Sequence, residues 1–190
     1  MTAGKRRWVL SGGMASGKST VRRLLERHRV VTIDADSVGH WVLESDGPAF
    51  ADVAARWPHV VEEGEIRRQA LASVVFNDRD ELEVLESITH PHIFDTIRAK
   101  VEEIDSPVVV EIPLLSHGLG DDWSRIVVDI DPVTQLERAL GKGMDPDDAR
   151  ARLGAQPSRE QWLAKADLVI PNHGTVEDLE QAVRLVAVVL

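Results

Sequence analysis

Ten consecutive residues near the start of the chain, SGGMASGKST at positions 11–20, restrict its fold more than any other stretch. They follow the short apolar run Trp8–Leu10 and precede a helical pattern from about Lys18 to His28. Residues Gly12–Ser19 match the pattern G-x-x-x-x-G-K-[ST]. Because glycine lets successive N–H groups turn inward, such a loop and the helix after it can bind a polyphosphate. The sequence therefore predicts a strand, a phosphate-binding loop (P-loop) and a helix.

The side chains of this loop have distinct expected roles. Lys18 would reach the β- and γ-phosphates as a point charge, and the Ser19 hydroxyl would bind Mg²⁺. A glycine-rich turn with a chance lysine is the alternative, and the strand–loop–helix setting disfavours it. The loop alone leaves open whether the terminal phosphoryl group goes to water, to a protein or to a small molecule. The candidate nucleotide-binding residues are Gly12, Gly13, Ala15, Ser16, Gly17, Lys18, Ser19 and Thr20.

Short apolar runs rich in β-branched residues alternate with longer helical patterns along the chain. This alternation is typical of a parallel sheet with helices on both faces, so we expect an α/β fold with a five-stranded sheet. In open sheets of this class, ligands bind beyond the carboxyl ends of the strands, so the residues after each run are candidate site residues. The runs cover residues 8–10, 30–33, 108–110, 126–128 and 168–170.

Several helix starts carry strong local signals. Asp131 and Asp145 each precede a proline, which suits an N-cap followed by a first-turn proline. Ser158 and Gln161 have the spacing of a capping box, and Thr175 precedes the terminal helical pattern. We therefore expect helices to begin at these positions.

The composition excludes several classes of site and location. Cysteine is absent, which excludes disulfide bonds and thiolate zinc sites and favours the cytoplasm. Lys5–Arg7 imitates the start of a signal peptide, but the following apolar stretch ends at Ser11, so we expect no export. The last apolar run, Val183–Leu190, is too short to cross a bilayer, and we expect no membrane role. A chain of 190 residues suits a single domain.

The formal net charge of −10 argues against a polyanionic partner. No basic stripe is long enough to track a nucleic-acid backbone, so we expect no nucleic-acid binding. An anionic small-molecule substrate would then need a locally basic pocket. Its candidate residues are Lys18, Arg22, Arg23, Arg67, Arg68, Arg138, Lys142, Arg150 and Arg152.

Candidate catalytic or metal-binding carboxylates follow two of the apolar runs. Asp34 and Asp36 come at the end of the run at residues 30–33, at the edge that would face a nucleotide. A carboxylate there can accept the proton of an alcohol and help to position Mg²⁺, so Asp36 is the candidate base; capping of the next helix is the alternative role for one of the pair. Glu111 could hold a metal-bound water, although a solvated strand end is equally compatible. The candidate metal ligands are Ser19, Asp36 and Glu111.

With the Asp34–Asp36 motif (Asp-Ala-Asp) in place, the chain resembles the dephospho-CoA kinase family over nearly its whole length. Many small kinases share the P-loop and this motif, but His90-Pro91, Ile-Pro-Leu-Leu at residues 112–115 and the terminal Ala-Asp and Asn-His-Gly stretches are more specific. The terminal stretches are Ala166-Asp167 and Asn172-His173-Gly174. Further matching stretches are Val75-Phe76, Leu85-Glu86, Gln135 with Arg138, and Ala151-Arg152 with Ala155-Gln156.

The resemblance implies a P-loop nucleotide-kinase-like fold with three layers and three parts. The core would cover about residues 1–35, 106–137 and 157–190, a helical acceptor-binding region about 36–105, and a lid about 138–156. The resemblance also implies a reaction, the transfer of the γ-phosphoryl group of ATP to the ribose 3′-hydroxyl of dephospho-CoA with Mg²⁺. We expect a monomeric cytoplasmic enzyme.

The resemblance further implies roles for residues outside the P-loop. Arg138, Lys142 and Arg152 of the lid would close over the phosphates and neutralise transition-state charge. Arg152 and Asn172 are further candidate nucleotide-binding residues. For His90, capping a helix end before Pro91 is the alternative to a role at the acceptor. The candidate acceptor-binding residues are Asp34, Asp36, His40, Arg67, His90, Leu115 and His117.

The sequence departs from the family pattern mainly on the acceptor side. His40 stands in a stretch that usually contains arginine, Arg67 where an aspartate is usual, and His117 where an acid is frequent. Lys142 replaces a lid arginine, which keeps the charge but loses the bidentate fork. Ordinary sequence drift at tolerant positions accounts for such departures without a change of function. Two alternatives stay open: a different hydroxyl acceptor, such as another nucleoside or nucleotide, and a nucleotide-binding regulator without catalysis.

Overall fold

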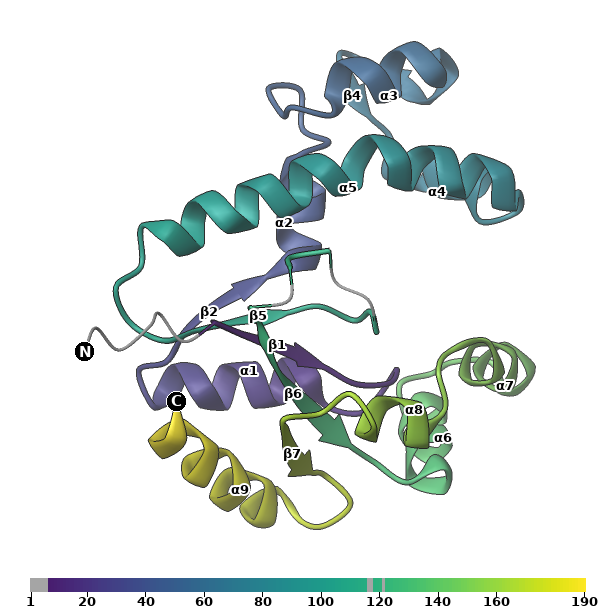
Figure 1. Cartoon of the computed structure of the whole chain (residues 1–190). Helices are drawn as coiled ribbons and strands as arrows, with labels where there is room; N and C mark the ends of the chain where they lie inside the picture. Colours follow the sequence, from purple (N-terminus) through teal and green to yellow (C-terminus); the bar gives the residue numbers. More distant parts are fainter. Residues whose placement is uncertain (1–6, 116–117, 121) are drawn as a thin grey trace. The chain divides into compact units, whose positions relative to one another are not determined.

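A five-stranded sheet carries the glycine-rich loop on its central strand (Figure 1). The computed structural model describes residues 7–115, 118–120 and 122–190. The strands cover Arg7–Ser11 (β1), Val31–Asp34 (β2), Val108–Glu111 (β5), Ser124–Asp129 (β6) and Leu168–Pro171 (β7). Their order is β2-β5-β1-β6-β7, and β1 pairs in parallel with β5 and β6, as β6 does with β7. The predicted parallel sheet of an α/β fold is confirmed.

The register of the sheet brings separate parts of the chain to the edge where the loop begins. Leu10 on β1 lies opposite Glu111 on β5, and Ser11 lies opposite Val127 on β6. Because these strands run in the same direction, the segments that follow β1, β5 and β6 leave the sheet at one edge. This is the edge at which open α/β sheets bind ligands.

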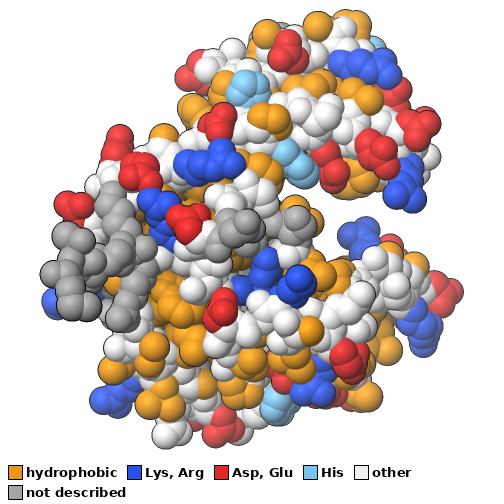
Figure 2. Space-filling view, in the orientation of Figure 1, with side chains coloured by type: hydrophobic (Ala, Val, Ile, Leu, Met, Phe, Trp, Pro, Cys, Tyr) orange, Lys and Arg blue, Asp and Glu red, His pale blue; other side chains and the backbone are white. Residues whose placement is uncertain are grey.

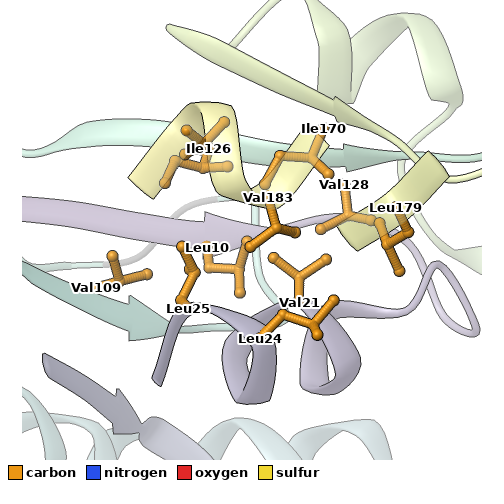
Figure 3. Close-up of a cluster of buried hydrophobic side chains, with 11 residues drawn as sticks. Leu10, Val21, Leu24, Leu25, Val109, Ile126, Val128, Ile170, Leu179 and Val183 are labelled. Atoms are coloured by element: carbon orange, nitrogen blue, oxygen red, sulfur yellow. The ribbon is translucent and has the colours of Figure 1, made fainter. Parts of the chain in front are cut away.

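Helices α1 (Lys18–Arg27) and α9 (Val176–Val189) bury one face of this sheet (Figure 3). In α1, Val21, Leu24 and Leu25 are buried, and their i, i+3, i+4 spacing places them on one side of the helix. This burial fixes the helix whose N-terminus closes the loop. The cluster consists of Leu10, Val21, Leu24, Leu25, Val109, Ile126, Val128, Ile170, Leu179, Val183 and Val186.

Helices α6 (Pro132–Gly141), α7 (Pro146–Ala155) and α8 (Arg159–Leu163) lie between β6 and β7 in the chain. Helices α6 and α7 contact each other, and α8 contacts β6. This segment contains the lid residues that the sequence resemblance implies.

The expected helix starts are confirmed by their capping contacts. Asp131 accepts hydrogen bonds from Val133 N at 3.1 Å and Thr134 N at 2.9 Å, and the Asp145 side chain caps α7 in the same way. Ser158 and Thr175 each form a capping box with the residue three positions later. These caps use side chains next to the backbone groups that they satisfy, which is why local sequence predicts them.

Residues Asp34–Glu103 form a compact unit of their own, separate from the unit formed by residues up to Ile33 and from Ile104 onward. This second unit has its own core, made of Val53, Trp57, Val60, Leu71 and Val75. Its elements are α2 (Ala35–Trp41), α3 (Phe50–Arg56), a 3₁₀ turn (Pro58–Val60), β3 (Val61–Glu62), β4 (Glu65–Ile66), α4 (Arg68–Val75) and α5 (Arg79–Glu102).

Helix α5 continues through Pro91, so the alternative in which His90 caps a helix end is wrong. Proline lacks the N–H that would bond to the preceding turn, and it usually ends or kinks a helix. Here Thr89 is buried before the proline, and Ile97 and Val101 are buried after it. Packing on both sides of Pro91 therefore outweighs the lost hydrogen bond.

The sequence did not predict the short antiparallel hairpin of β3 and β4. Its turn residues Glu63 and Gly64 have φ of 51° and 81°, and two successive positive φ angles are typical of a type I′ hairpin turn. The usual Asn-Gly or Asp-Gly signal is replaced by Glu-Gly. The hairpin leads directly into Arg67, which forms an ion pair with Glu62 at 2.6 Å.

On the face shown in Figure 2, side chains of both charge signs are interspersed. Among the described residues, strongly exposed apolar side chains lie on helices α9 and α6 and at the end of α4, for example Val188, Val133 and Phe76. No helix within the described ranges is both long enough and apolar enough to cross a bilayer.

Candidate active site

The glycine-rich loop holds backbone conformations that side chains rarely allow. Gly12 and Gly17 have φ of 145° and 99°. Space is restricted as well, because a Cβ on Gly12 would lie 2.8 Å from Val128 O, and a Cβ on Gly17 would collide with the amide of Asn172. These two glycines of the motif are therefore required both by their dihedral angles and by their neighbours.

Lys18 lies across the loop. Its Nζ donates hydrogen bonds to Gly12 O at 2.9 Å and to Gly13 O at 3.0 Å. In the same loop, Ser16 Oγ is buried and has no hydrogen-bond partner within the described structure. Because buried polar atoms nearly always find a partner, this hydroxyl suits a ligand that brings oxygen atoms to the loop, as a phosphate does.

Ser19, Glu111 and Arg22 form a hydrogen-bonded group at the start of α1. Ser19 Oγ donates to Glu111 Oε1 at 3.0 Å, and Arg22 Nε donates to Glu111 Oε2 at 2.8 Å. Glu111 is buried, and the ion pair with Arg22 compensates the desolvation of its carboxylate. The sequence marks Arg22 only as one basic residue among several, but its position three residues after Ser19 places both on one face of α1.

Met14, at the tip of the loop, is held by two glutamines. Gln135 Nε2 of α6 donates to Met14 O at 2.7 Å, and Met14 N donates to Gln156 Oε1 at 2.7 Å. Gln156 is the C-cap directly after the last residue of α7. The sequence resemblance includes both glutamines but gives neither a role, because nothing local connects them to residue 14.

Asn172 contacts the loop from the strand β7 side. Its Nδ2 donates to Ser16 O at 2.7 Å, its backbone N donates to Asp129 O at 2.8 Å, and the residue is 6% exposed. The sequence predicts Asn172 as a candidate nucleotide-binding residue. In the structure its amide is used to hold the loop backbone.

A bidentate ion pair joins α8 to the end of β6. Arg159 Nε and Nη2 donate to the two carboxylate oxygens of Asp129, each at 2.7 Å. Hydrogen bonding from Arg159 holds the pKa of Asp129 below its ordinary value, and the same contact raises the pKa of Arg159. The pair attaches the first residue of α8, three positions after Gln156, to the end of β6. The sequence did not single out this pair.

Arg125 is a buried arginine within strand β6. Its Nη1 donates to Ser11 Oγ at 2.7 Å and to Leu114 O at 3.2 Å, and its Nη2 donates to Leu115 O at 2.7 Å. Burial lowers the pKa of Arg125, while the charge of Asp167 raises it. One guanidinium thus connects the end of β1 to the segment after β5. The signal for it in the sequence is a charged residue beside the apolar run at residues 126–128.

Oxygen ligands for a cation are few in the described part of the chain. No group of three or more His, Cys, Asp or Glu side chains there could hold a metal ion. Ser19 Oγ and the Glu111 carboxylate do lie side by side, at 3.0 Å. Mg²⁺ typically takes only one or two protein ligands and completes its shell with waters and substrate phosphates, so this pair suits it.

The dephospho-CoA kinase family model matches residues 8–178, which is most of the chain. The chain belongs to the dephospho-CoA kinase family. A protein named dephospho-CoA kinase from Thermobifida fusca is 40% identical over 182 residues, covering 92% of this chain and 90% of that protein. The family resemblance drawn from the sequence is confirmed.

Solved structures agree with this membership of the dephospho-CoA kinase family. A Thermus thermophilus structure matches with a TM-score of 0.83 at 28% identity, covering 97% of each chain. A structure of dephospho-CoA kinase from Campylobacter jejuni matches with a TM-score of 0.73 at 26% identity, covering 95% of this chain and 94% of that one. The expected P-loop kinase fold is confirmed.

Of the acceptor-binding residues predicted from the sequence, two lie at the start of α2. Asp34 is the N-cap, and its Oδ1 accepts hydrogen bonds from Asp36 N at 3.0 Å and Ser37 N at 3.4 Å. The capping role left open for one of the two aspartates therefore belongs to Asp34. Asp36 lies in the first turn of α2 and is exposed.

The other acceptor-side candidates are spread over both units. In the second unit, His40 is exposed on α2, Arg67 pairs with Glu62, and the His90 ring lies 5.5 Å from the Phe94 ring. Leu115, in the first unit, is half-buried and offers its carbonyl to Arg125. His117 lies outside the described residues.

The candidate lid cations are on α6 and α7. Arg138 is half-buried on α6, and Lys142, at the end of α6, is exposed. On α7, Arg152 Nε forms an ion pair with Asp148 at 2.9 Å. Arg138 and Lys142 therefore lie at the far end of the helix whose first turn contacts the P-loop through Gln135.

Proposed function

We propose that this chain transfers the γ-phosphoryl group of ATP to the ribose 3′-hydroxyl of dephospho-CoA, with ADP and coenzyme A as products. The observation that carries the proposal is a P-loop with Lys18 across it and Ser19 bonded to a buried Glu111, in a member of the dephospho-CoA kinase family. The P-loop supports the phosphoryl donor, and the family supports the acceptor.

On the donor side, we assign the phosphates of ATP to the backbone N–H groups of the loop. Lys18 Nζ, already over the loop, would bind the β- and γ-phosphates, and Ser16 Oγ would find its missing hydrogen-bond partner there. Ser19 and Glu111 would hold Mg²⁺, Ser19 directly and Glu111 through a water. When bound, Mg²⁺ neutralises part of the phosphate charge.

On the acceptor side, Asp36 would take the proton of the ribose hydroxyl as its oxygen attacks the γ-phosphorus. The new O–P bond forms as the bond to the ADP oxygen breaks, and the proton ends on the Asp36 carboxylate. Asp34 supports this role by capping α2, which fixes the first turn that contains Asp36. We assign acceptor binding to Asp34, His40, Arg67, His90, Leu115 and His117.

The segment from Arg138 to Gln156 would act as the lid. Arg138 and Lys142 would stabilise the charge that spreads over the transferred group, and Arg152 would reach the nucleotide after leaving Asp148. Lysine at position 142 supplies a point charge without the bidentate fork of arginine. We further propose that the enzyme works as a monomer in the cytoplasm.

The experiment is a mass-spectrometric assay of the purified protein with Mg²⁺, ATP and dephospho-CoA. Coenzyme A should form with the unchanged protein and not with Lys18→Ala. Asp36→Asn should lower kcat by about 10²–10⁴-fold, the usual contribution of a general base, while ATP still binds. Asp52→Asn, an exposed aspartate in the first turn of α3, is the matched control and should leave kcat unchanged.

Two results would contradict the proposal. ATP binding without any coenzyme A would reject dephospho-CoA as the acceptor, and a panel of nucleosides and nucleotides would then identify the hydroxyl that is used. Equal turnover of Asp36→Asn and the unchanged protein would remove Asp36 from the role of base.

A further inference from the structure

The two glutamines that hold Met14 come from opposite ends of the α6–α7 segment. Gln135 lies near the start of α6, and Gln156 is the C-cap directly after the last residue of α7. Both are half-buried, and each contributes one hydrogen bond of 2.7 Å to the backbone of the same residue. The chemistry of the two contacts is opposite, because Gln135 donates a hydrogen bond and Gln156 accepts one.

The contact of Gln135 fixes the direction of one peptide group. In a planar trans peptide, the C=O and the following N–H point in opposite directions. Since Gln135 holds Met14 O, the N–H of Ala15 points away from Gln135. Ala15 also has φ of 57°, a left-handed conformation that alanine adopts only when its surroundings impose it. Gln135 thus turns the Ala15 N–H to the side opposite the α6 contact.

The contact of Gln156 fixes the preceding peptide group in the same manner. Gln156 Oε1 accepts a hydrogen bond from Met14 N–H, so Gly13 O, on the same peptide group, points away from Gln156. The contacts of Gly13 O agree with this direction, because it accepts hydrogen bonds from Lys18 Nζ at 3.0 Å and from Ser16 N at 3.2 Å. A Cβ on Gly13 would collide with Gln135 Nε2 and lie 3.2 Å from Gln156 Oε1. Both amides therefore press closely on the loop.

We propose that Gln135 and Gln156 are positioning residues, which orient the peptides on either side of Met14 so that the Ala15 N–H faces the nucleotide phosphates. Neither side chain is assigned a contact with substrate; both act through the loop backbone. The proposal rests on the proposed function only in placing ATP at the loop, and it makes no use of the acceptor.

The opposite chemistry of the two contacts gives a matched pair of variants. Gln135→Glu cannot donate to Met14 O and sets a carboxylate against that carbonyl, whereas Gln156→Glu can still accept from Met14 N, as a charge-assisted bond. Both variants add one negative charge beside the same residue. A difference between them therefore reports the hydrogen bonds and not the charge.

The first measurement is the affinity of each variant for Mg²⁺-ATP by titration calorimetry. Gln135→Glu should weaken binding by about tenfold or more, and Gln156→Glu by less than about threefold. Gln135→Met, which loses the donor without adding charge, should weaken binding in the same direction. Gln181→Glu, at an exposed position on α9, should leave the affinity unchanged.

Steady-state kinetics with dephospho-CoA provides the second measurement. Gln135→Glu should raise KM for ATP and leave KM for the acceptor within about twofold, whereas a general loss of structure would affect both. Equal weakening by the two glutamate variants, or no weakening by Gln135→Glu and Gln135→Met, would overturn the proposal. Because calorimetry needs no acceptor, its result stands whether or not dephospho-CoA is the substrate.

Discussion

Replacing the buried Arg125 by methionine should separate the stability of this protein from its affinity for the acceptor. The guanidinium donates hydrogen bonds to Ser11 Oγ, Leu114 O and Leu115 O, and 7% of the residue is exposed. Methionine fills a similar volume but donates none of these bonds. The substitution therefore removes the link between the end of β1 and the segment that follows β5.

The expected loss of stability is modest because two large contributions oppose each other. Each hydrogen bond from a charged group contributes about 1.5–3 kcal/mol, so the bonds to these three acceptors total about 5–9 kcal/mol. Withdrawing the guanidinium from water costs several kcal/mol, which the methionine variant avoids. Leu114 is 43% exposed, so water can replace part of the lost contacts. A net loss of about 2 kcal/mol remains, which lowers Tm by about 4–8 °C for a chain of this size.

The effect on function should be confined to the acceptor. Without the guanidinium of Arg125, the carbonyls of Leu114 and Leu115 hydrogen-bond to water instead. The segment that carries Leu115, one of the proposed acceptor-binding residues, then loses its fixed position. KM for dephospho-CoA should rise about tenfold, equivalent to about 1.4 kcal/mol, while KM for ATP should stay within about twofold.

Thermal unfolding and steady-state kinetics of Arg125→Met test both parts, with the exposed Arg184→Met as the matched control. Arg125→Lys should behave like the methionine variant in KM, since an ammonium group lacks the planar fork that reaches both carbonyls. The reasoning is refuted if KM for ATP rises as much as KM for the acceptor, or if Arg125→Met leaves both Tm and the acceptor KM unchanged.

Two further predictions concern stability. The depressed pKa of Asp129 means that its pair with Arg159 stabilises the fold above the ordinary aspartate pKa of about 3.9, and that this contribution is lost as pH falls through the lower folded pKa. The Tm difference between the unchanged protein and Asp129→Asn should be full at neutral pH and shrink in acid below about pH 3.9; a constant difference would contradict the assignment. Leu25→Ala empties a fully buried site beneath α1 and should cost about 2–5 kcal/mol in urea unfolding. Leu185→Ala, at a position 66% exposed on α9, should change stability by less than about 0.5 kcal/mol.

The sequence by itself determined the features that depend on neighbours a few residues away. The P-loop follows from glycines and a lysine at fixed spacing, the helix starts follow from Asp131, Asp145, Ser158 and Thr175, and the strands follow from short apolar runs. The loop and capping signals act through backbone groups next to the residues that carry them. The apolar runs identify strands because their residue types and short length are local properties. The order in which the motifs occur was sufficient to identify the family.

Only the tertiary structure decided which distant residues complete the site. Ser19 and Glu111 are 92 residues apart, Met14 and Gln135 are 121 apart, and Met14 and Gln156 are 142 apart. The sheet brings the segments that carry such residues to one edge, and their spacing in the sequence does not predict which of them will be in contact. The continuation of α5 through Pro91 also depends on tertiary packing, because burial of Ile97 and Val101 outweighs the tendency of proline to end a helix. Local hydrogen bonding thus fixed the motif of this protein, and packing over long chain separations fixed the partners that hold it.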